Sequence, residues 1–433
     1  MVLARPLHSR SLAVPLGPAN DRHRCEAETQ TLGMRGPALA WELRPMDLLS
    51  PDHLRDPHLM FNRLRGTSPV FHNSAANCWM LLDYASIKSA LSDTVTFSSR
   101  VEQFEWMIFH DPPRHTRLRS LVSKVFTPAA IAVLAPRIAA LCSSLLEPLS
   151  QKPCFDAATE FAAPLPLLVI AELLGIPSAD RDRFKQWADA ILGLSYTITG
   201  GDGARVAVEK FRQASAEMSD YLAGVLAADP ANSIGSQADS LLVRLAGAEI
   251  DGEKLTHAEI LGFFQLLLLA GSETTANLIG NSLICLIDHP DQRALLRRRP
   301  ELLPGLIEEV LRFRSPLQTI FRRTTREVEV QGQLIPADEL VLLALSSANR
   351  DPLVFGHPDR FDISRDPNPH LSFGLGPHFC LGAVLGRLEA RIALGQFLDH
   401  FPTFAYARST PWIPRATFQV HGPANLEVTR LPE

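Results

Sequence analysis

Phe373-Gly-Leu-Gly-Pro-His-Phe-Cys380-Leu-Gly382 places one cysteine between a glycine-rich loop and a segment of regularly spaced apolar residues. The apolar residues recur at three- and four-residue spacing, which predicts a helix. Cys380 is therefore expected at a helix N-terminus, where unpaired backbone N–H groups and the helix dipole favour the thiolate over the thiol. A thiolate in such a position is a good soft ligand for iron.

The residues around the cysteine suit a flat ligand. Gly374, Gly376 and Gly382 permit positive φ and close backbone approach, and Phe373 can shield the sulfur from solvent. A buried structural cysteine is the alternative for any single cysteine, and these neighbours disfavour it. A dinucleotide-binding loop is also disfavoured, because Phe379 occupies the last glycine position of G-x-G-x-x-G and no βαβ unit surrounds it.

The stretch resembles the haem-binding signature of cytochrome P450s, Phe-x-x-Gly-x-x-x-Cys-x-Gly, at every fixed position. This resemblance implies a mainly α P450 fold, with many helices and a smaller β-rich portion. It also implies haem b (heme b, iron protoporphyrin IX) between a central threonine helix and the cysteine helix, with Cys380 as the axial thiolate ligand. Phe373, Gly374 and Gly382 would then belong to the haem-binding loop.

Composition narrows the class of protein. The chain has 433 residues, 46% of them hydrophobic, and a formal net charge of -5. It can bury a large core, and it lacks the concentrated basic charge of a nucleic-acid-binding protein. The six cysteines contain no C-x-x-C pair, which argues against a disulfide framework and a zinc site and fits a reducing cytoplasm.

The N-terminal region differs from the rest of the chain. Residues 1–40 are rich in Arg, Pro and small polar residues and are expected to be a disordered arm, with an organelle transit peptide as the alternative. Residues 41–433 are expected to form a single domain. No segment is expected to reach the roughly 18 to 20 apolar residues that span a bilayer.

Two basic groups follow a double proline in His110-Asp-Pro-Pro-Arg-His115-Thr-Arg-Leu-Arg119. The prolines begin a helix, and His115 and Arg119 lie four residues apart on one face, where together they can clamp a carboxylate. A solvated basic face is the alternative. The segment resembles the P450 C-helix, whose matching His and Arg bind haem propionates.

A helix of over thirty residues is predicted from the capping box Thr256-His-Ala-Glu259 to Asp288-His-Pro290. Its middle reads Ala270-Gly271-Ser272-Glu273-Thr274-Thr275, where an acid and an alcohol in a buried position require partners. A tolerated kink is the alternative. The six residues resemble the P450 oxygen-binding motif Ala-Gly-x-Glu/Asp-Thr. The resemblance implies that Thr274 and Glu273 deliver protons and that Ala270 and Gly271 face the haem.

Glu309 and Arg312 share a helix face between this motif and the cysteine loop. E-x-x-R is common, so its position carries the argument. Downstream, Pro358-Asp-Arg360-Phe361 resembles the Pro-x-Arg-Phe element that completes the P450 Glu-Arg-Arg triad. Such a buried network fixes the geometry of a loop more than it adds net stability.

The segment 321–343 predicts a hairpin that turns at Gln331-Gly332. Arg322 matches the family arginine that holds a second propionate. Its neighbour Arg323 is the alternative candidate for this role. His378, two residues before the cysteine, has the same implied role in many bacterial members.

The four motifs together imply a soluble, bacterial-type P450 monooxygenase. It would insert one oxygen atom of O2 into a small, largely apolar substrate, with two electrons from a ferredoxin (or flavodoxin) and its NAD(P)H reductase. Apolar residues near the motifs predict the pocket, namely Phe263, Leu267, Leu317 and Ile320. A monomer is expected. The alternatives are a P450-fold peroxygenase, an isomerase or dehydratase, and a non-catalytic haem-thiolate binding protein.

The cysteine side of the haem is expected to present a locally basic face to an acidic ferredoxin, although solvated charge is the alternative for each residue. The residues of this expected face are Arg114, Arg117, Lys124, Arg387 and Arg391.

Overall fold

The computed structural model describes residues 50–74, 76–102, 104–124, 126–194, 201–227, 240–250, 252–408 and 412–431. The expected N-terminal arm of residues 1–40 lies outside this part of the chain. The large majority of the regular structure is helical, as predicted, and a smaller part consists of short strands.

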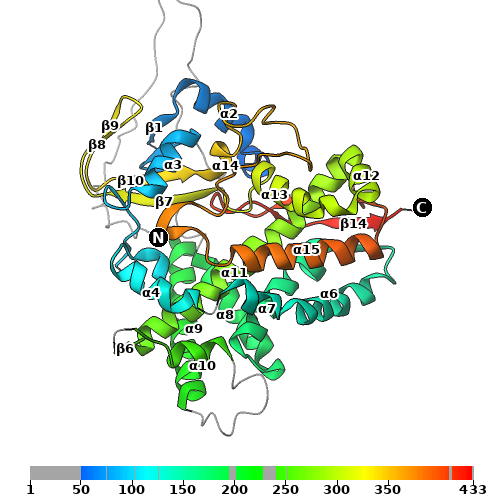
Figure 1. The fold of residues 1–433 in the computed structure, drawn as a ribbon, viewed down its shortest axis with the longest axis horizontal. Helices are drawn as coiled ribbons and strands as arrows, with labels where there is room; N and C mark the ends of the chain where they lie inside the picture. Colours follow the sequence, from blue (N-terminus) through cyan, green and yellow to red (C-terminus); the bar gives the residue numbers. More distant parts are fainter. Residues whose placement is uncertain are drawn as a thin grey trace, which may run out of the picture.

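Helix α11, His257–Asp288, is the longest helix in the described part of the chain. The predicted capping box is present: the Thr256 hydroxyl accepts from the Glu259 backbone N–H at 3.2 Å, and the Glu259 carboxylate accepts from the Thr256 N–H at 2.9 Å. The helix ends before Pro290, which begins α12, because proline supplies no N–H to continue the ladder. Figure 1 shows α11 crossing the middle of the molecule.

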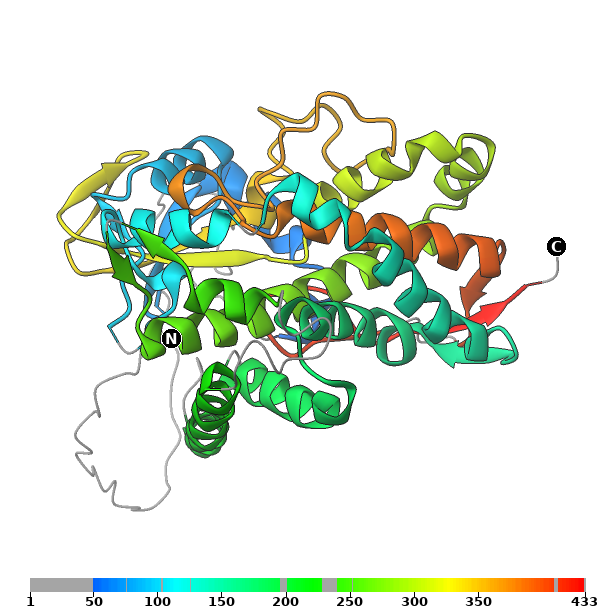
Figure 2. The same ribbon diagram turned by 60° about the horizontal axis from the view of Figure 1, so that its bottom comes forward.

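Other helices enclose α11. Figure 2 shows α15, in orange, on one side of α11, while α8 and α9 lie on the other. Besides α11, the α-helices of the described part of the chain are α1 Pro51–Arg55, α2 His58–Thr67, α3 Tyr84–Ser92, α4 Arg114–Ser123, α5 Pro128–Ala132, α6 Ala135–Leu149, α7 Pro164–Leu174, α8 Arg181–Gly193, α9 Gly201–Ala227, α10 Leu241–Ala246, α12 Pro290–Arg298, α13 Leu303–Phe313, α14 Leu345–Ala348 and α15 Ala383–His400.

The strands gather mainly at one end of the molecule, on the left of Figure 1. The main sheet has the order β1-β2-β10-β7-β3, in which β10 pairs parallel to β2 and antiparallel to β7. Its strands are β1 Val70–Asn73, β2 Cys78–Leu81, β3 Phe97–Ser98, β7 Thr319–Thr324 and β10 Leu340–Ala344. The smaller sheets use β4 Cys154–Asp156, β5 Glu249–Ile250, β6 Glu253–Lys254, β8 Val328–Val330, β9 Gln333–Ile335, β11 Phe404–Tyr406, β12 Ile413–Pro414, β13 Pro423–Asn425 and β14 Glu427–Arg430.

The hairpin predicted at Gln331-Gly332 is confirmed. β8 and β9 pair antiparallel across this turn. Gln331 and Gly332 have φ of 51° and 75°, the left-handed values that a tight two-residue hairpin requires at both central positions.

Close helix packing explains one glycine of the central motif. A Cβ built on Gly271 would lie 2.5 Å from Cδ1 of Ile170 on α7. The two helices can therefore approach each other here only because residue 271 carries no side chain. α7 and α11 both contribute to the largest hydrophobic cluster of the described residues.

One apolar stretch differs from the expectation that no segment is long and apolar enough to span a bilayer. Residues Pro128–Leu149, which contain α5 and α6, are long and apolar enough by length and composition alone. Only 28% of the most apolar 18-residue part of this stretch is buried inside the structure. Core helices of soluble proteins pass the same test, so the stretch is weak evidence for a membrane span.

Two buried histidines lie side by side among arginines. His58 begins α2 and His421 precedes β13. Neither ring nitrogen of His58 has a hydrogen-bond partner among the described residues. Burial holds the pKa of His58 well below its usual value, and the charges of Arg350, His421, Arg314 and Arg65 lower it further. Burial likewise lowers the pKa of His421.

The depressed pKa of His58 predicts acid sensitivity. The unfolded chain binds more protons than the folded protein below about pH 6.5, so the free energy of unfolding should fall with decreasing pH, by up to about 1.4 kcal/mol per pH unit for each such histidine. Urea unfolding from about pH 7.5 to pH 5.5 should give a shallower pH slope for His58→Leu. His72→Gln, at an exposed position on β1, is the control and should keep the wild-type slope. An unchanged slope in His58→Leu would contradict this account.

Candidate functional site

The cysteine loop is fixed by backbone hydrogen bonds. The Cys380 N–H donates to the Phe373 carbonyl at 2.8 Å. Gly374 and Gly376 have φ of 70° and 71°, as predicted, whereas Gly382 has φ of -81°. Gly382 is the N-cap of α15, so the cysteine lies just before the N-terminus of the helix.

The pKa of the Cys380 thiol is not lowered, as was expected, but raised. Burial raises the pKa of Cys380, while a hydrogen bond from the Gly382 N–H and the charges of Arg119 and Arg387 act in the opposite direction. The expectation considered only the helix terminus, and in the protein chain alone desolvation of the sulfur is the larger effect. A coordinated metal cation deprotonates a thiol, so the raised pKa is compatible with a metal-ligand role.

Phe373 is held beside the cysteine loop by a cation. The Arg387 guanidinium carbon lies 4.4 Å from the centroid of the Phe373 ring. The same guanidinium makes two hydrogen bonds to Glu308, at 2.6 and 2.8 Å. These contacts position the ring as the predicted shield of the sulfur requires.

Four cationic or imidazole side chains meet on the β7 side of the cysteine loop. The rings of His115, from α4, and His378 have centroids 4.0 Å apart. Arg322 reaches the same region from β7 and is buried, and the Arg119 guanidinium donates to the Phe379 carbonyl at 2.6 Å. The sequence had suggested these four residues from three separate segments, and the structure brings them together.

Several polar nitrogens of this cluster are buried without a partner. Burial and neighbouring cations lower the pKa of His115 to about 4 and of His378 to about 3, and burial lowers the pKa of Arg322 to about 10. Both ring nitrogens of His115 and Nε of Arg322 are buried without a hydrogen-bond partner in the described part of the chain. Unpaired buried donors are costly, and carboxylates would satisfy them. The residues present therefore fit the propionates of a haem.

Arg322 and Arg323 differ in burial and in the side of β7 that they face. Arg323 is 36% exposed and pairs with Asp338 at 2.9 Å, whereas Arg322 points to the buried side of β7. Adjacent strand residues face opposite sides of a sheet, so only one of the two can reach the cluster. Sequence reasoning missed Ser99, whose hydroxyl lies 3.3 Å from Nε2 of His378. No motif marks it.

On α11, the motif residues divide between two faces. Ala270 is exposed and Thr274 is half-buried, and the Thr274 hydroxyl donates to the Ala270 carbonyl at 2.8 Å. Glu273 is buried on another face, so the expectation of an acid and an alcohol that are both buried is correct only for the acid. Gly271 faces α7, as described above, so its Cβ position is directed at Ile170 and not at the open side of the helix.

Glu273 has a partner that no motif suggested. Nη1 of Arg415 lies 3.7 Å from its carboxylate, and Nε of Arg415 donates to Asn277 at 3.0 Å. Burial raises the pKa of Glu273, and Arg415 lowers it. Arg415 directly follows β12, far along the chain, which is why local patterns could not find it.

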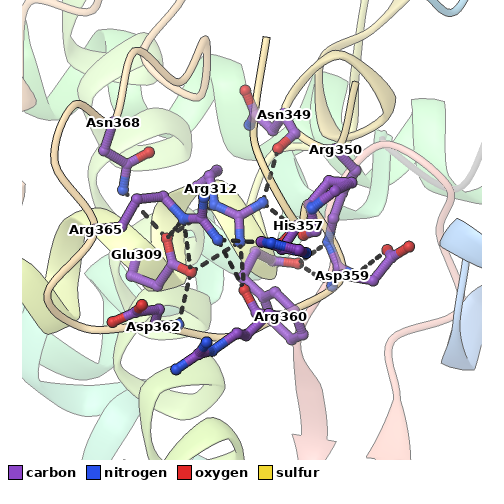
Figure 3. Close-up of polar contacts among 12 residues, drawn as sticks. Glu309, Arg312, Asn349, Arg350, His357, Asp359, Arg360, Asp362, Arg365 and Asn368 are labelled. Carbon is purple, nitrogen blue, oxygen red and sulfur yellow. Dashed lines mark hydrogen bonds and ion pairs between the residues drawn. The ribbon is translucent and has the colours of Figure 1, made fainter. Parts of the chain in front are cut away.

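The predicted Glu309–Arg312 pair is confirmed, and both side chains are 0% exposed. Figure 3 shows the two side chains joined by paired hydrogen bonds, each 2.8 Å long. The remaining Arg312 N–H groups donate to backbone carbonyls of Asn349, Pro358 and Arg360. All five donors of the guanidinium are therefore used.

The third member of this network is not Arg360. Nε of Arg365 lies 3.1 Å from the Glu309 carboxylate, whereas Arg360 is exposed and contributes only its carbonyl (Figure 3). The Pro-x-Arg-Phe resemblance placed the arginine five residues too early. The backbone at Asp362 donates its N–H to Glu309 at 2.9 Å and so turns the following segment inwards.

Comparisons with known proteins agree with this geometry. Residues 206–421 match the family model of the cytochrome P450s. Cytochrome P450 107B1 of Saccharopolyspora erythraea is 39% identical over 390 residues, which cover 84% of this chain and 92% of that protein. This chain belongs to the cytochrome P450 family. It is accordingly an oxidoreductase of the cytochrome P450 monooxygenase class, and this family and fold imply a haem-thiolate centre.

Two further relatives of this P450 illustrate its neighbours. Cyclomarin C epoxidase of Salinispora arenicola is 39% identical over 364 residues, which cover 81% of this chain and 90% of the epoxidase. The crystal structure of CYP109E1 from Bacillus megaterium with testosterone superposes with a TM-score of 0.79 at 34% identity, covering 87% of this chain and 100% of that one. The mainly α P450 fold expected from the sequence is thereby confirmed.

Replacing the two candidate arginines separates their roles. Arg365→Ala should leave part of the Glu309 charge unpaired in the interior, at a cost of about 3 kcal/mol, and should reduce haem incorporation. Arg360→Ala, the matched control, should stay within about 0.5 kcal/mol of the parent because its side chain is exposed. Urea unfolding and the ratio of Soret to protein absorbance measure both effects. Equal behaviour of the two variants would contradict the assignment of Arg365.

Proposed function

We propose that this P450 binds haem b through the Cys380 thiolate and hydroxylates or epoxidises a small, largely apolar organic substrate. The observation that carries this proposal is the buried cluster of unpartnered donors around His115 and Arg322 beside the cysteine loop. A carboxylate-bearing planar ligand over this loop would satisfy these donors. The haem, when bound, supplies the activation of O2 and the transfer of one oxygen atom.

The residues of the chain would hold and orient this group. His115, Arg119, Arg322 and His378 bind its propionates, and Phe373 covers the cysteine side. On the opposite side, the exposed Ala270 leaves room at the middle of α11.

Proton delivery is assigned to Thr274 and Glu273. The Thr274 hydroxyl lies on the open side of α11 and can pass on a proton while it remains oriented by the Ala270 carbonyl. Glu273 is the buried acid, and Arg415 holds its carboxylate on a neighbouring face. Transfer from Glu273 to Thr274 therefore requires a bridging water or a movement of the carboxylate.

The substrate class follows from the apolar surroundings. Phe263 is buried on α11, and Leu267, Leu317 and Ile320 are half-buried on α11 and near β7. We propose that these four side chains line the substrate pocket, where they would favour apolar ligands. The named relatives include a protein crystallised with testosterone and a cyclomarin C epoxidase, which supports a small, largely apolar organic substrate for this chain as well.

Electrons are proposed to come from a ferredoxin (or flavodoxin) with its NAD(P)H reductase. Of the five basic residues expected on the docking face, Arg114, Arg117 and Arg387 already pair with Glu105, Glu253 and Glu308. Lys124 and Arg391 are exposed, and so are the apolar side chains of Phe379 and Val384 beside the cysteine. The proposed docking face is therefore mixed in character, with less free positive charge than the sequence suggests.

We further propose that residues 41–433 act as one domain, as a monomer, in the cytoplasm. The scattered cysteines support a reducing compartment. Elements from Met107–Phe109 to Pro423–Asn425 pack on α11, which supports a single folding unit.

The ligand role of Cys380 can be tested without turnover. The reduced wild-type protein with carbon monoxide should show the red-shifted Soret band of thiolate-bound haem, and Cys380→Ala should lose it because no other thiol lies in the loop. Cys154→Ser, at an exposed cysteine on β4, is the control and should keep the band. Persistence of the shifted band in Cys380→Ala would overturn the assignment.

Thr274→Ala tests proton delivery. The variant should bind haem normally, and its product formed per NAD(P)H consumed should fall about tenfold, with the electrons diverted to peroxide or water. Ser272→Ala is a matched control, because the Ser272 hydroxyl also bonds back four residues, to Leu268, on a buried face of the same helix. It should keep the coupling of the parent. Full coupling in Thr274→Ala would show that the hydroxyl is structural.

A further inference from the structure

The segment before α4 crosses the N-terminal half of α11 in close contact. A Cβ built on Gly262 would lie 2.4 Å from the Glu105 carbonyl oxygen, so this crossing needs a glycine. One turn further along α11, the indole N–H of Trp106 donates to Oε1 of Gln265 at 2.9 Å. Two neighbouring contacts thus hold residues 104–109 against the helix.

Gln265 also reaches a third element. Its side-chain nitrogen donates to the Ser215 hydroxyl of α9 at 2.8 Å. The residue interrupts an apolar run and is 5% exposed, and a buried amide must be hydrogen-bonded at both ends to offset its desolvation. One side chain therefore joins the segment 104–109, α11 and α9.

Aromatic rings continue this junction towards the haem-binding cluster. Trp106 stacks on Phe109 at 5.4 Å, and Phe109 lies 5.8 Å from Phe321 of β7, the neighbour of Arg322 in sequence. On the other side, Phe104 lies 5.8 Å from Phe211 of α9. We call Phe104, Trp106, Phe109, Phe211 and Phe321 the aromatic wall.

Further contacts join α9 to α8 and to the residue before it. Trp187 of α8 packs on Phe264 at 6.0 Å, and its indole N–H donates to Glu217 at 3.0 Å. The Tyr221 hydroxyl donates to Asp180 at 3.1 Å. Ser215 and Glu217 are two residues apart, so the bond to Gln265 and the bond to Trp187 hold neighbouring positions of α9, and Tyr221 holds a position further along the helix.

We propose that Gln265 is a positioning residue that controls access to the substrate cavity, by tying the Trp106 side of the aromatic wall to α9. This inference rests on the proposed function, because it takes the side of α11 that bears Ala270 and Thr274 as the cavity. Ligands larger than the closed opening enter only when α9 separates from residues 104–109, and that separation breaks the bridge at Gln265. Small ligands enter without it.

The test measures ligand association to the ferric haem protein, not turnover. Stopped-flow mixing with the bulky azole clotrimazole and with imidazole follows nitrogen coordination through the Soret shift. Gln265→Met keeps the volume and removes both hydrogen bonds, so association of clotrimazole should become roughly five- to tenfold faster. Association of imidazole should change less than about twofold, because a small ligand does not need the opening.

Trp106→Phe tests the indole side of the bridge. It keeps a ring and loses the N–H donor, and it should accelerate clotrimazole by a smaller factor. Combined with Gln265→Met it should add little, since both changes break the same bond. Ser215→Ala tests the α9 side and serves if Gln265→Met does not fold. Tyr221→Phe is the matched control: it removes the hydrogen bond from α9 to Asp180, six residues further along the helix than Ser215, and should leave the clotrimazole rate unchanged.

The outcomes separate the two proposals. If the wild-type protein forms no thiolate-bound haem, the proposed function fails before the access question arises. If the haem protein forms and clotrimazole associates with Gln265→Met and Ser215→Ala at the wild-type rate, the positioning role of Gln265 is overturned. Equal acceleration by Tyr221→Phe, or equal acceleration of imidazole, would also overturn it, because the effect would then be general loosening.

Discussion

The buried ion pair of Glu309 and Arg312 is the constraint on which the site depends. Two opposite charges at 0% exposure are stable only if every donor and lone pair has a partner, because desolvation otherwise costs several kcal/mol. Arg312 meets this condition by donating hydrogen bonds to the backbone carbonyls of Asn349, Pro358 and Arg360. The charge pair therefore determines where the long segment before the cysteine loop must run.

Asn349 carries this constraint to the cysteine. Its carbonyl accepts from Arg312, its side-chain oxygen accepts from the Leu371 N–H at 2.7 Å, and its side-chain nitrogen donates to Ser372 at 2.8 Å. Phe373 follows directly, and its carbonyl accepts the N–H of Cys380. Hydrogen bonds and the peptide link between Ser372 and Phe373 thus connect the ion pair to the backbone of Cys380.

The buried polar residues of the central helix also depend on partners from outside the helix. Gln265, Glu273, Asn277 and Asn281 interrupt its apolar surface, and all four have partners outside the helix. Gln265 bonds with Trp106 and Ser215, Arg415 contacts both Glu273 and Asn277, and Asn281 donates to the carbonyls of Arg314 and His421. Each buried polar group accepts only partners placed at the right distance and angle. These residues therefore set the order in which elements pack around α11.

Features that depend on neighbours in the chain were predictable from the amino-acid sequence: the capping box at Thr256, the turn at Gln331-Gly332, the glycine conformations before Cys380 and the Glu309–Arg312 spacing. Local backbone geometry dictates each of them.

Contacts between distant segments were not predictable in this way. Arg365 replaces Arg360 because of a backbone turn at Asp362, Arg322 is chosen over Arg323 by the side of β7 that faces the core, and Arg415 reaches Glu273 across more than a hundred residues. Sequence spacing carries no information on which distant side chains share a buried volume, and burial is what gives these charges their role.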